Sequence, residues 1–408
     1  MNHTLVTFLG RTQRTDAGGY RQATYRFPDG FESQSAYLGL TLAEYLKPDR
    51  VVILGTPGSM WSVLVENLAM QDDEEGVRIE LMEAEEKEAV PPEMLGRVEP
   101  LMRRAIGCDV TPRLIPFGRD AEEQYAILDN IEDVLQAGRA SFDLTHGFRH
   151  LGMVGFMSAF MLERVRKLRV EGLWYGALDM SDRETGITPV LKLDGLMHVR
   201  RWVDALDRFD ANGDYGVFAP LLIEDGVPED KARFLDRAAF YERTLNLSGA
   251  AQEIRNFAPV LDAPLAGASE LFRDRLRERL GWARYVDLGE HQRKLAFEHL
   301  DRRDYMRAAA FGWEALVTLE CDYRGYTASD YHAGRKPAIE ELEAELVDGK
   351  HSQHVRHAFF QLKNIRNAIV HGNPPNTKEY RRILKDAERL HTELGAALRR
   401  LLDERGQE

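Results

Sequence analysis

The sequence predicts a Rossmann-like α/β domain with a mostly parallel, doubly wound sheet, followed by an all-α domain. Up to Asp194, short apolar runs alternate with helical patterns, which is typical of a parallel sheet covered by helices. Beyond Asp194, strand-like segments are nearly absent and helical spacing dominates. We therefore expect one domain over residues 1–194 and a second over 291–408. Residues 195–290 form either a helical connector or the first helices of the second domain.

The expected strands of the first half are apolar or alternating runs bounded by glycine, proline or loop residues. They are residues 5–9, 23–27, 51–56, 79–82, 113–117, 140–144, 170–178 and 187–193. Residues 35–46, a segment starting at Met60, and residues 122–135 and 151–168 have helical spacing, whereas the polar residues 11–20 read as a loop. The expected helices of the second half are residues 197–209, 228–245, 250–257, 269–281, 292–300, 305–321, 337–346, 354–371 and 377–402.

Composition indicates a globular protein and excludes several classes. With 44% hydrophobic and 30% charged residues, the chain is ordinary for a soluble domain. The net charge of −13 argues against a general nucleic-acid coat protein, although a small basic groove remains compatible with it. Cys108 and Cys321 are too few for a disulfide framework or a cysteine zinc site. No apolar run spans a bilayer and no signal peptide is evident, so we expect a cytoplasmic protein without a membrane partner.

Three predicted strand ends carry residues suited to binding an anionic ligand, and in doubly wound sheets ligands bind beyond the carboxyl ends of strands. Free backbone N–H groups at a helix start would hold a phosphate. An arginine can donate two parallel hydrogen bonds to a phosphate, and a threonine hydroxyl can bond a ribose or phosphate oxygen. The first end offers Gly10, Arg11 and Thr12, the second Thr56, Gly58 and Ser59, and the third Thr145, His146, Gly147 and Arg149.

These strand ends do not form a dinucleotide fingerprint. Gly10 begins no G-x-G-x-x-G pattern, and a polar loop rather than a helix follows it. For His146 alone, the simpler interpretation is a turn histidine with satisfied hydrogen bonds. The neighbouring Thr145, Gly147 and Arg149 favour ligand binding instead.

The segment Asp143-Leu144-Thr145-His146-Gly147-Phe148-Arg149-His150 resembles the signature of CARF domains, the Rossmann-like cyclic-oligoadenylate sensors of ancillary CRISPR-associated proteins. The resemblance covers about residues 1–194. It implies a homodimer that binds cyclic oligoadenylate (tetra- or hexa-adenylate) across its two-fold axis as an allosteric activator. It implies no other cofactor and no stable protein partner. Thr145, His146, Gly147 and Arg149 match the signature directly, whereas Gly10, Arg11, Thr12, Gly58 and Ser59 match only by their place at strand ends.

Arg366, Asn367 and His371 stand at the end of a predicted helix in the second half. Residues five apart on an ideal helix are separated by about 140° of rotation and about 7.5 Å of rise, so Arg366 and His371 do not lie on the same face of the helix. We expect them to converge only if the helix end distorts or a second subunit supplies a partner pair. His371 lies in the last turn, where the helix dipole favours the imidazolium.

These residue types suit ribonuclease chemistry without a metal. The 2′-hydroxyl of RNA attacks the adjacent phosphate, His371 transfers or positions the proton, and Arg366 stabilises the developing charge. Asn367 would orient the phosphate or hold the imidazole tautomer. No metal-binding pattern such as His-Glu-x-x-His occurs in this half.

The pattern Arg366-Asn367-x-x-x-His371-Gly372 resembles the HEPN ribonuclease motif, over about residues 292–402. HEPN domains commonly follow CARF domains, so the resemblance implies an endoribonuclease that cleaves single-stranded RNA. Two alternatives stay open: a nucleotide-responsive regulator or scaffold that cleaves no RNA, and a ring nuclease in which His146 or Thr12 helps to degrade the cyclic oligoadenylate.

Basic residues flank this motif and would either track an RNA backbone or form a solvated helix face. They are Lys350, Arg356, Lys363, Lys378, Arg381, Arg382 and Lys385. Glu314 is expected either to approach the motif or to form a structural pair.

Overall fold

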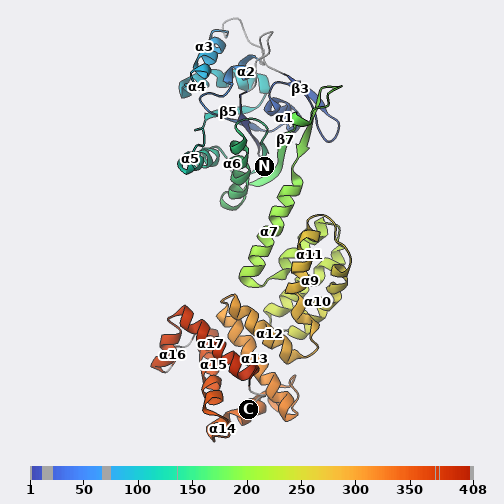
Figure 1. Cartoon of the computed structure of the whole chain (residues 1–408), viewed down its shortest axis with the longest axis vertical. Coiled ribbons are helices and arrows are strands. Elements are labelled where there is room, and N and C mark those ends of the chain that lie inside the picture. Colours follow the sequence, from blue (N-terminus) through green and yellow to red (C-terminus); the bar gives the residue numbers. More distant parts are fainter. Residues whose placement is uncertain are drawn as a thin grey trace. The chain divides into compact units, whose positions relative to one another are not determined.

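The computed structural model describes residues 2–11, 22–66, 75–135, 137–372, 374–375 and 377–404. The chain divides into two compact units, Met1–Leu196 and Met197–Glu408, coloured from blue to green and from green to red in Figure 1. The division falls close to the boundary predicted at residue 194. Thr12 and most of the predicted loop 11–20 lie outside the described residues.

The first unit is built on an eight-stranded mixed sheet of order β3-β2-β8-β7-β6-β1-β4-β5. The pairings among β7, β6, β1, β4 and β5, and that between β2 and β8, are parallel. β2 pairs with β3, and β7 with β8, in antiparallel fashion. The strands are β1 (His3–Leu9), β2 (Ala23–Arg26), β3 (Glu32–Ser35), β4 (Arg50–Gly55), β5 (Asp109–Leu114), β6 (Arg139–Asp143), β7 (Arg169–Gly176) and β8 (Ile187–Lys192).

Helices cover this sheet, as the doubly wound prediction requires (Figure 1). α2, α3 and α4 pack together, and α5 packs against α6. The central strands β1 and β4 are almost entirely buried, which explains their near-continuous apolar sequence. The helices are α1 (Leu38–Leu46), α2 (Trp61–Glu66), α3 (Glu75–Glu86), α4 (Pro92–Ile106), α5 (Ala121–Val134), α6 (Arg149–Val165) and the 3₁₀ turn Leu178–Met180.

Three predictions in this unit are wrong in detail. Residues 79–82 lie within α3 and are not a strand, because Leu81 and Glu85 are buried at helical spacing. The helix predicted over residues 35–46 is shorter, since its start belongs to β3 and a turn. The strand predicted over 113–117 ends at Leu114 and begins earlier, at Asp109.

In the second unit, every secondary-structure element among the described residues is a helix or a helical turn. One hydrophobic core runs from Trp202 to Leu401, so residues 197–290 share their core with the later helices. Its helices are α7 (Asp194–Asn212), which begins just before the boundary, α8 (Ala219–Glu224), α9 (Glu229–Arg243), α10 (Leu247–Asp262), α11 (Ser269–Arg279), α12 (Leu288–Asp301), α13 (Tyr305–Arg324), α14 (Lys336–Val347), α15 (Gln353–His371), α16 (Lys378–Ile383) and α17 (Ala387–Leu402), with 3₁₀ turns Tyr215–Phe218 and Gly281–Arg284 and a π-helical turn Tyr331–Arg335.

The helical pattern missed α8 and merged α16 with α17. The break between these last two helices is marked by Asp386, whose carboxylate accepts a hydrogen bond from the backbone N–H of Arg389 at 3.0 Å. Such a bond is an N-cap, and it starts α17. No described helix is both long enough and apolar enough to cross a membrane.

Candidate functional site

The carboxyl ends of β6, β1 and β4 lie next to one another at one edge of the sheet. β1 pairs in parallel with both neighbours, so the loops that follow the three strands are brought together. Two of these loops approach very closely: a Cβ atom on Gly10 would lie 2.4 Å from the backbone nitrogen of Gly147. Any side chain at position 10 would therefore clash with the loop after β6. The candidate ligand edge thus combines segments that are far apart in the sequence.

The loop after β4 is buried next to this edge and is not exposed to solvent there. Thr56, Gly58 and Ser59 are buried. The Ser59 hydroxyl donates to the carbonyl of Leu9 at 2.7 Å and accepts from the backbone N–H of Thr56 at 2.9 Å. These hydroxyls therefore bind the loop to the end of β1.

The backbone N–H groups at the start of α2 are also occupied. Those of residues 59–61 donate to backbone carbonyls at 2.9–3.0 Å. The N–H of Ser62 donates to the buried carboxylate of Glu85, which also accepts from the Ser62 hydroxyl at 2.8 Å. Contrary to the prediction, these amide groups are not free to hold a phosphate, because the turn and α3 already satisfy them.

Arg11 links the loops after β1 and β4. Its Nε donates to the carbonyl of Gly58 at 2.7 Å, and its Nη2 pairs with the Glu88 carboxylate at 2.5 Å. About half of the Arg11 side chain is exposed. An anionic ligand reaching Arg11 must therefore compete with Glu88.

Asp143, at the end of β6, organises the signature segment from within the sheet. Its fully buried carboxylate accepts from the Thr7 hydroxyl at 2.6 Å and from the backbone N–H of Thr145 at 2.9 Å. The Thr145 hydroxyl accepts in turn from the N–H of Gly176, at the end of β7, at 2.8 Å. Thr145 therefore links the ends of β6 and β7. One of the lone pairs of its hydroxyl is already used and is not available to a ligand.

His146 is held in a defined protonation state. Its Nε2 accepts a hydrogen bond from the backbone N–H of Leu38 at 3.0 Å, so Nε2 carries no proton. Burial lowers the pKa of His146, although the nearby Asp143 carboxylate acts in the opposite direction. The Tyr37 ring lies against the imidazole, with ring centres 5.2 Å apart. His146 is thus a neutral ring whose Nε2 is bonded to the start of α1.

Arg149 is the first residue of α6 and stands exposed. No hydrogen bond or ion pair joins its side chain to the parts of the chain that the structure describes. Beside it, Phe148 is 43% exposed and stacks on His150, with ring centres 5.8 Å apart. Arg149 therefore combines an available guanidinium with an adjacent exposed aromatic ring.

Sequence reasoning missed several residues at this edge. A shallow hollow is lined by Leu9, Gly10, Arg11, Ala36, Tyr37, Met60, Val63 and His146. Ala36 and Tyr37 lie between β3 and α1, so a rule based on carboxyl ends of parallel strands does not find them. Phe117 and Arg119 follow β5 and would have been found by that rule; the Arg119 guanidinium lies 4.4 Å from the centre of the Phe117 ring.

The second candidate site lies at the end of α15, where Arg366 and His371 converge within one chain. Arg366 Nη1 lies 3.3 Å from His371 Nε2 and donates to Asn367 Oδ1 at 2.9 Å. The helix continues to His371 and ends at Gly372, whose φ is +65°. The prediction that convergence needs a distorted helix or a partner subunit is wrong, because the long arginine side chain spans the angular gap.

Neighbouring side chains hold Arg366 in place. Its guanidinium lies 6.0 Å from the centre of the Trp313 ring, and its Nε is buried without a hydrogen-bond partner among the described residues. Asn367 contacts Arg366 rather than the imidazole. His371 itself is exposed. An anion approaching the end of α15 thus meets a fixed guanidinium and an accessible imidazole together.

Glu314 and one predicted basic residue belong to structural pairs. Glu314 pairs with Arg335, which agrees with the structural alternative for Glu314. Lys363 pairs with Glu343 at 2.6 Å. Arg381 donates to the carbonyl of Pro375 at 2.7 Å, beside the end of α15. Lys350, Arg356, Lys378, Arg382 and Lys385 are exposed.

Comparison with known proteins identifies the first unit. Residues 4–178 match the model of the CARF domain of CRISPR system endoribonuclease Csx1. CRISPR-associated protein MJ1674 of Methanocaldococcus jannaschii is 23% identical over 382 residues, which are 87% of this chain. The chain spans 59% of the length of that relative.

A solved structure of Enterococcus italicus Csm6 bound to cyclic hexa-2′-fluoro-hexa-dAMP aligns with 99% of the chain and 95% of its own, at 11% identity and a TM-score of 0.36. The match over residues 4–178 agrees with the Rossmann-like sheet and includes the segment Asp143–His150 at the candidate ligand edge. Over residues 4–178, the first unit therefore carries a CARF domain like that of CRISPR-associated proteins, as the segment Asp143–His150 predicted.

Proposed function

We propose that this protein is an endoribonuclease that cyclic oligoadenylate activates. One observation carries the catalytic part: Arg366 and His371 lie 3.3 Å apart at an exposed helix end, with Asn367 bonded to the same guanidinium. A cation and an imidazole so placed supply charge stabilisation and proton transfer to one phosphate. The CARF match to an endoribonuclease family supports this choice of reaction.

The chemistry follows from the RNA itself. The 2′-oxygen bonds to the adjacent phosphorus while the bond from phosphorus to the 5′-oxygen breaks, leaving a 2′,3′-cyclic phosphate and a 5′-hydroxyl. Neutral His371 takes the proton of the 2′-hydroxyl, and Arg366 stabilises the charge that develops on the phosphate oxygens. Asn367 positions the guanidinium. The 5′-oxygen receives its proton from the His371 of a second chain when two such sites meet in a homodimer.

Cyclic oligoadenylate is the proposed activator, and its site is the edge formed by the loops after β1, β4 and β6. Arg149 is the best phosphate contact there, because it is exposed and bonded to no described residue. Gly10 and Gly147 allow the ring to approach the backbone, while Arg11 and Thr145 contribute after releasing present partners. Thr56, Gly58, Ser59 and His146 shape the edge from inside.

A homodimer is proposed because α6 carries an exposed apolar face beside this edge. Met153, Met157 and Val165 are 71%, 58% and 60% exposed, respectively. Exposed apolar patches on a globular domain mark interaction sites. A second copy covering this face would place two signature segments around one cyclic ligand. The ligand activates only if it binds the active arrangement of the dimer more tightly than the resting one.

The bonding of His146 weighs against ring cleavage in the first unit. Its Nε2 is occupied by the Leu38 N–H, so it is a poor general base. Incubating cyclic tetra-adenylate with the His371→Ala variant tests this alternative separately from RNA cleavage.

The decisive experiment measures cleavage of labelled single-stranded RNA with cyclic tri-, tetra- and hexa-adenylate. We expect cleavage by the wild-type chain with one of these rings, and none by Arg366→Ala or His371→Ala. RNA left intact by the wild-type chain with all three rings would instead favour a regulator or scaffold. Products ending in 2′,3′-cyclic phosphate are expected, and 3′-hydroxyl products would exclude attack by the 2′-oxygen.

A further inference from the structure

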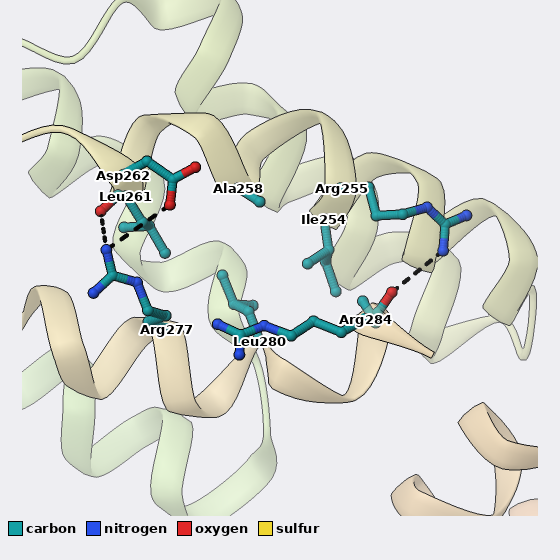
Figure 2. Close-up of a pocket in the computed structure, with 9 residues that line it drawn as sticks. Ile254, Arg255, Ala258, Leu261, Asp262, Arg277, Leu280 and Arg284 are labelled. Carbon is teal, nitrogen blue, oxygen red and sulfur yellow. Dashed lines mark hydrogen bonds and ion pairs between the residues drawn. The ribbon is translucent and has the colours of Figure 1, made fainter. Parts of the chain in front are cut away.

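The second unit contains a hollow that none of the proposed chemistry uses. It lies between α10 and the segment formed by α11 and the turn Gly281–Arg284 (Figure 2). Its space is about 400 Å³, including the open mouth. Its floor is formed by the buried aliphatic side chains of Ile254, Leu261, Leu280 and Ala283. Small-molecule sites share this mostly apolar lining.

Two arginines fix the walls of the hollow without any ligand. Arg255 of α10 donates to the carbonyl of Ala283 at 3.2 Å, and Arg277 of α11 donates to the carbonyl of Leu261. Figure 2 shows these two bonds at opposite ends of the hollow. Each bond joins α10 to the segment on the opposite side of the hollow, so the width of the hollow is fixed before a ligand binds. A pre-formed site loses little free energy to rearrangement when a ligand enters.

A third arginine supplies an unused charge. Arg284 is exposed, and Figure 2 shows its side chain extending along the hollow toward Leu280. No hydrogen bond or ion pair joins it to any residue within the described ranges. Three arginines and one carboxylate, Asp262, line the hollow, giving it two net positive charges in a chain whose net charge is −13. This local excess of positive charge selects an anion.

We propose that this hollow binds a nucleotide, with the base against the aliphatic floor and the phosphate on Arg284. The flat faces of a base need apolar contact, which Ile254, Leu261 and Leu280 provide. A guanidinium with no internal partner is suited to forked hydrogen bonds with phosphate. The Asp262 carboxylate is exposed and lies 4.0 Å from Arg277 Nη2, and its other lone pairs can accept from the exocyclic amine of adenine or cytosine. The ligand is either a free nucleotide or the terminal nucleotide of an RNA strand.

The test measures binding of adenosine 5′-monophosphate to the full-length chain by isothermal titration calorimetry. The His371→Ala background is used so that RNA is not consumed, which also makes the result independent of ribonuclease activity. Arg284→Ala removes the phosphate contact, and Ala258→Trp fills the hollow from an exposed position of α10. The control is Arg275→Ala, which removes an exposed arginine of α11 outside the hollow.

We expect Arg284→Ala and Ala258→Trp each to weaken binding about tenfold or more, and Arg275→Ala to leave it unchanged. Competition by single-stranded RNA with a 3′-terminal phosphate would identify an RNA end as the ligand, and its absence would identify a free nucleotide. Nucleotide binding that is undetectable, or equal in all variants, overturns the proposal. So does binding of decanoate at this site with no binding of nucleotides. If Ala258→Trp does not fold, the surface variant Arg284→Ala still decides the outcome.

Discussion

At the scale of single residues, Arg366 carries the proposed catalysis. Its guanidinium contacts Asn367 and His371 and lies over Trp313. We expect Arg366→Lys to lower the rate of RNA cleavage by about 100-fold, although the charge is kept. A lysine ammonium lacks the planar fork that bonds a phosphate and Asn367 at once. The measurement is single-turnover cleavage at saturating activator.

The matched control is Arg356→Lys, an exposed arginine on the same helix. It should change the cleavage rate little, because one surface charge is exchanged for another. Equal rates for Arg366→Lys and the wild type would show that Arg366 acts only as a point charge. Equal losses in both variants would indicate a general effect of α15.

His146 makes the stability of the first unit depend on pH. Its pKa is lowered from an ordinary value of 6.5, chiefly by burial. The unfolded chain therefore binds more protons than the folded chain below pH 6.5, and the free energy of unfolding falls as the pH drops through this window. The slope for one histidine is at most about 1.4 kcal/mol per pH unit.

Urea unfolding at pH 7.5 and pH 5.5 tests this, with His146→Gln as the comparison. Glutamine keeps an acceptor for the Leu38 N–H but does not titrate. We expect a smaller loss of stability at pH 5.5 in the variant. Some dependence should remain, since burial also lowers the pKa values of His3 and His291. An unchanged pH dependence in His146→Gln would refute the assignment.

The sequence predicted candidate site residues but not what their side chains contact. The residues of the segment 143–150 alone predicted a ligand edge there. The partners that occupy Thr145 and His146, namely the N–H groups of Gly176 and Leu38, come from β7 and α1. Such pairings depend on which strands are neighbours, and no local pattern contains that information. The same holds for Trp313, which reaches Arg366 from another helix.

At the scale of elements, periodicity predicted most of the long segments but missed α4 (Pro92–Ile106), and it failed for several short segments. The four residues 79–82 look like a strand by themselves. In the structure they lie within α3, which the buried Glu85 carboxylate joins to Ser62 of α2. The missed β3 has a polar sequence, Glu32–Ser35, and is formed by pairing with β2. A strand that is stabilised mainly by pairing with its neighbour does not need β-branched or aromatic residues of its own, so its sequence does not predict a strand.

The end of α15 offers a test of how precisely His371 must be held. Gly372 has a φ of +65°, a left-handed conformation that an alanine adopts at a cost of about 1 kcal/mol. We expect Gly372→Ala to fray the last turn and lower RNA cleavage several-fold. Gly349 provides the control: it is also left-handed, with φ +75°, and a Cβ on either glycine would meet no atom within 4 Å.

Both alanine variants should therefore lose similar stability in thermal unfolding. Only Gly372→Ala should lose activity, because only Gly372 adjoins His371. A similar loss of activity in both would mean that cleavage responds to global stability, whereas full activity in Gly372→Ala would show that the last turn tolerates disorder.

At the scale of the whole molecule, the change of character near Asp194 lies close to the boundary between the compact units Met1–Leu196 and Met197–Glu408. The mixed directions of the strands in the sheet were harder to predict. The sequence predicted mostly parallel strands, whereas β3 and β8 run antiparallel to their neighbours β2 and β7. The composition of β8 does not reveal whether its partner runs parallel or antiparallel, and the polar β3 gives no strand signal at all.

Assembly is the remaining question at this scale, and the exposed face of α6 allows it to be tested. We expect the double variant Met153→Glu/Met157→Glu to be monomeric where the wild type is dimeric, because two carboxylates on each chain would face their copies across an apolar contact. Sedimentation velocity gives the assembly state directly. RNA cleavage should be lost together with the dimer, although Arg366 and His371 are unchanged.

The control for this variant is Leu271→Glu, which introduces the same charge at a 73% exposed apolar residue of α11. It should remain dimeric and active. A dimeric double variant would place the interface elsewhere. A monomeric double variant that still cleaves RNA would show that one Arg366–His371 pair is a complete site, which their 3.3 Å separation within a single chain makes a concrete alternative. The two measurements together therefore decide whether α6 joins the chains and whether catalysis needs both.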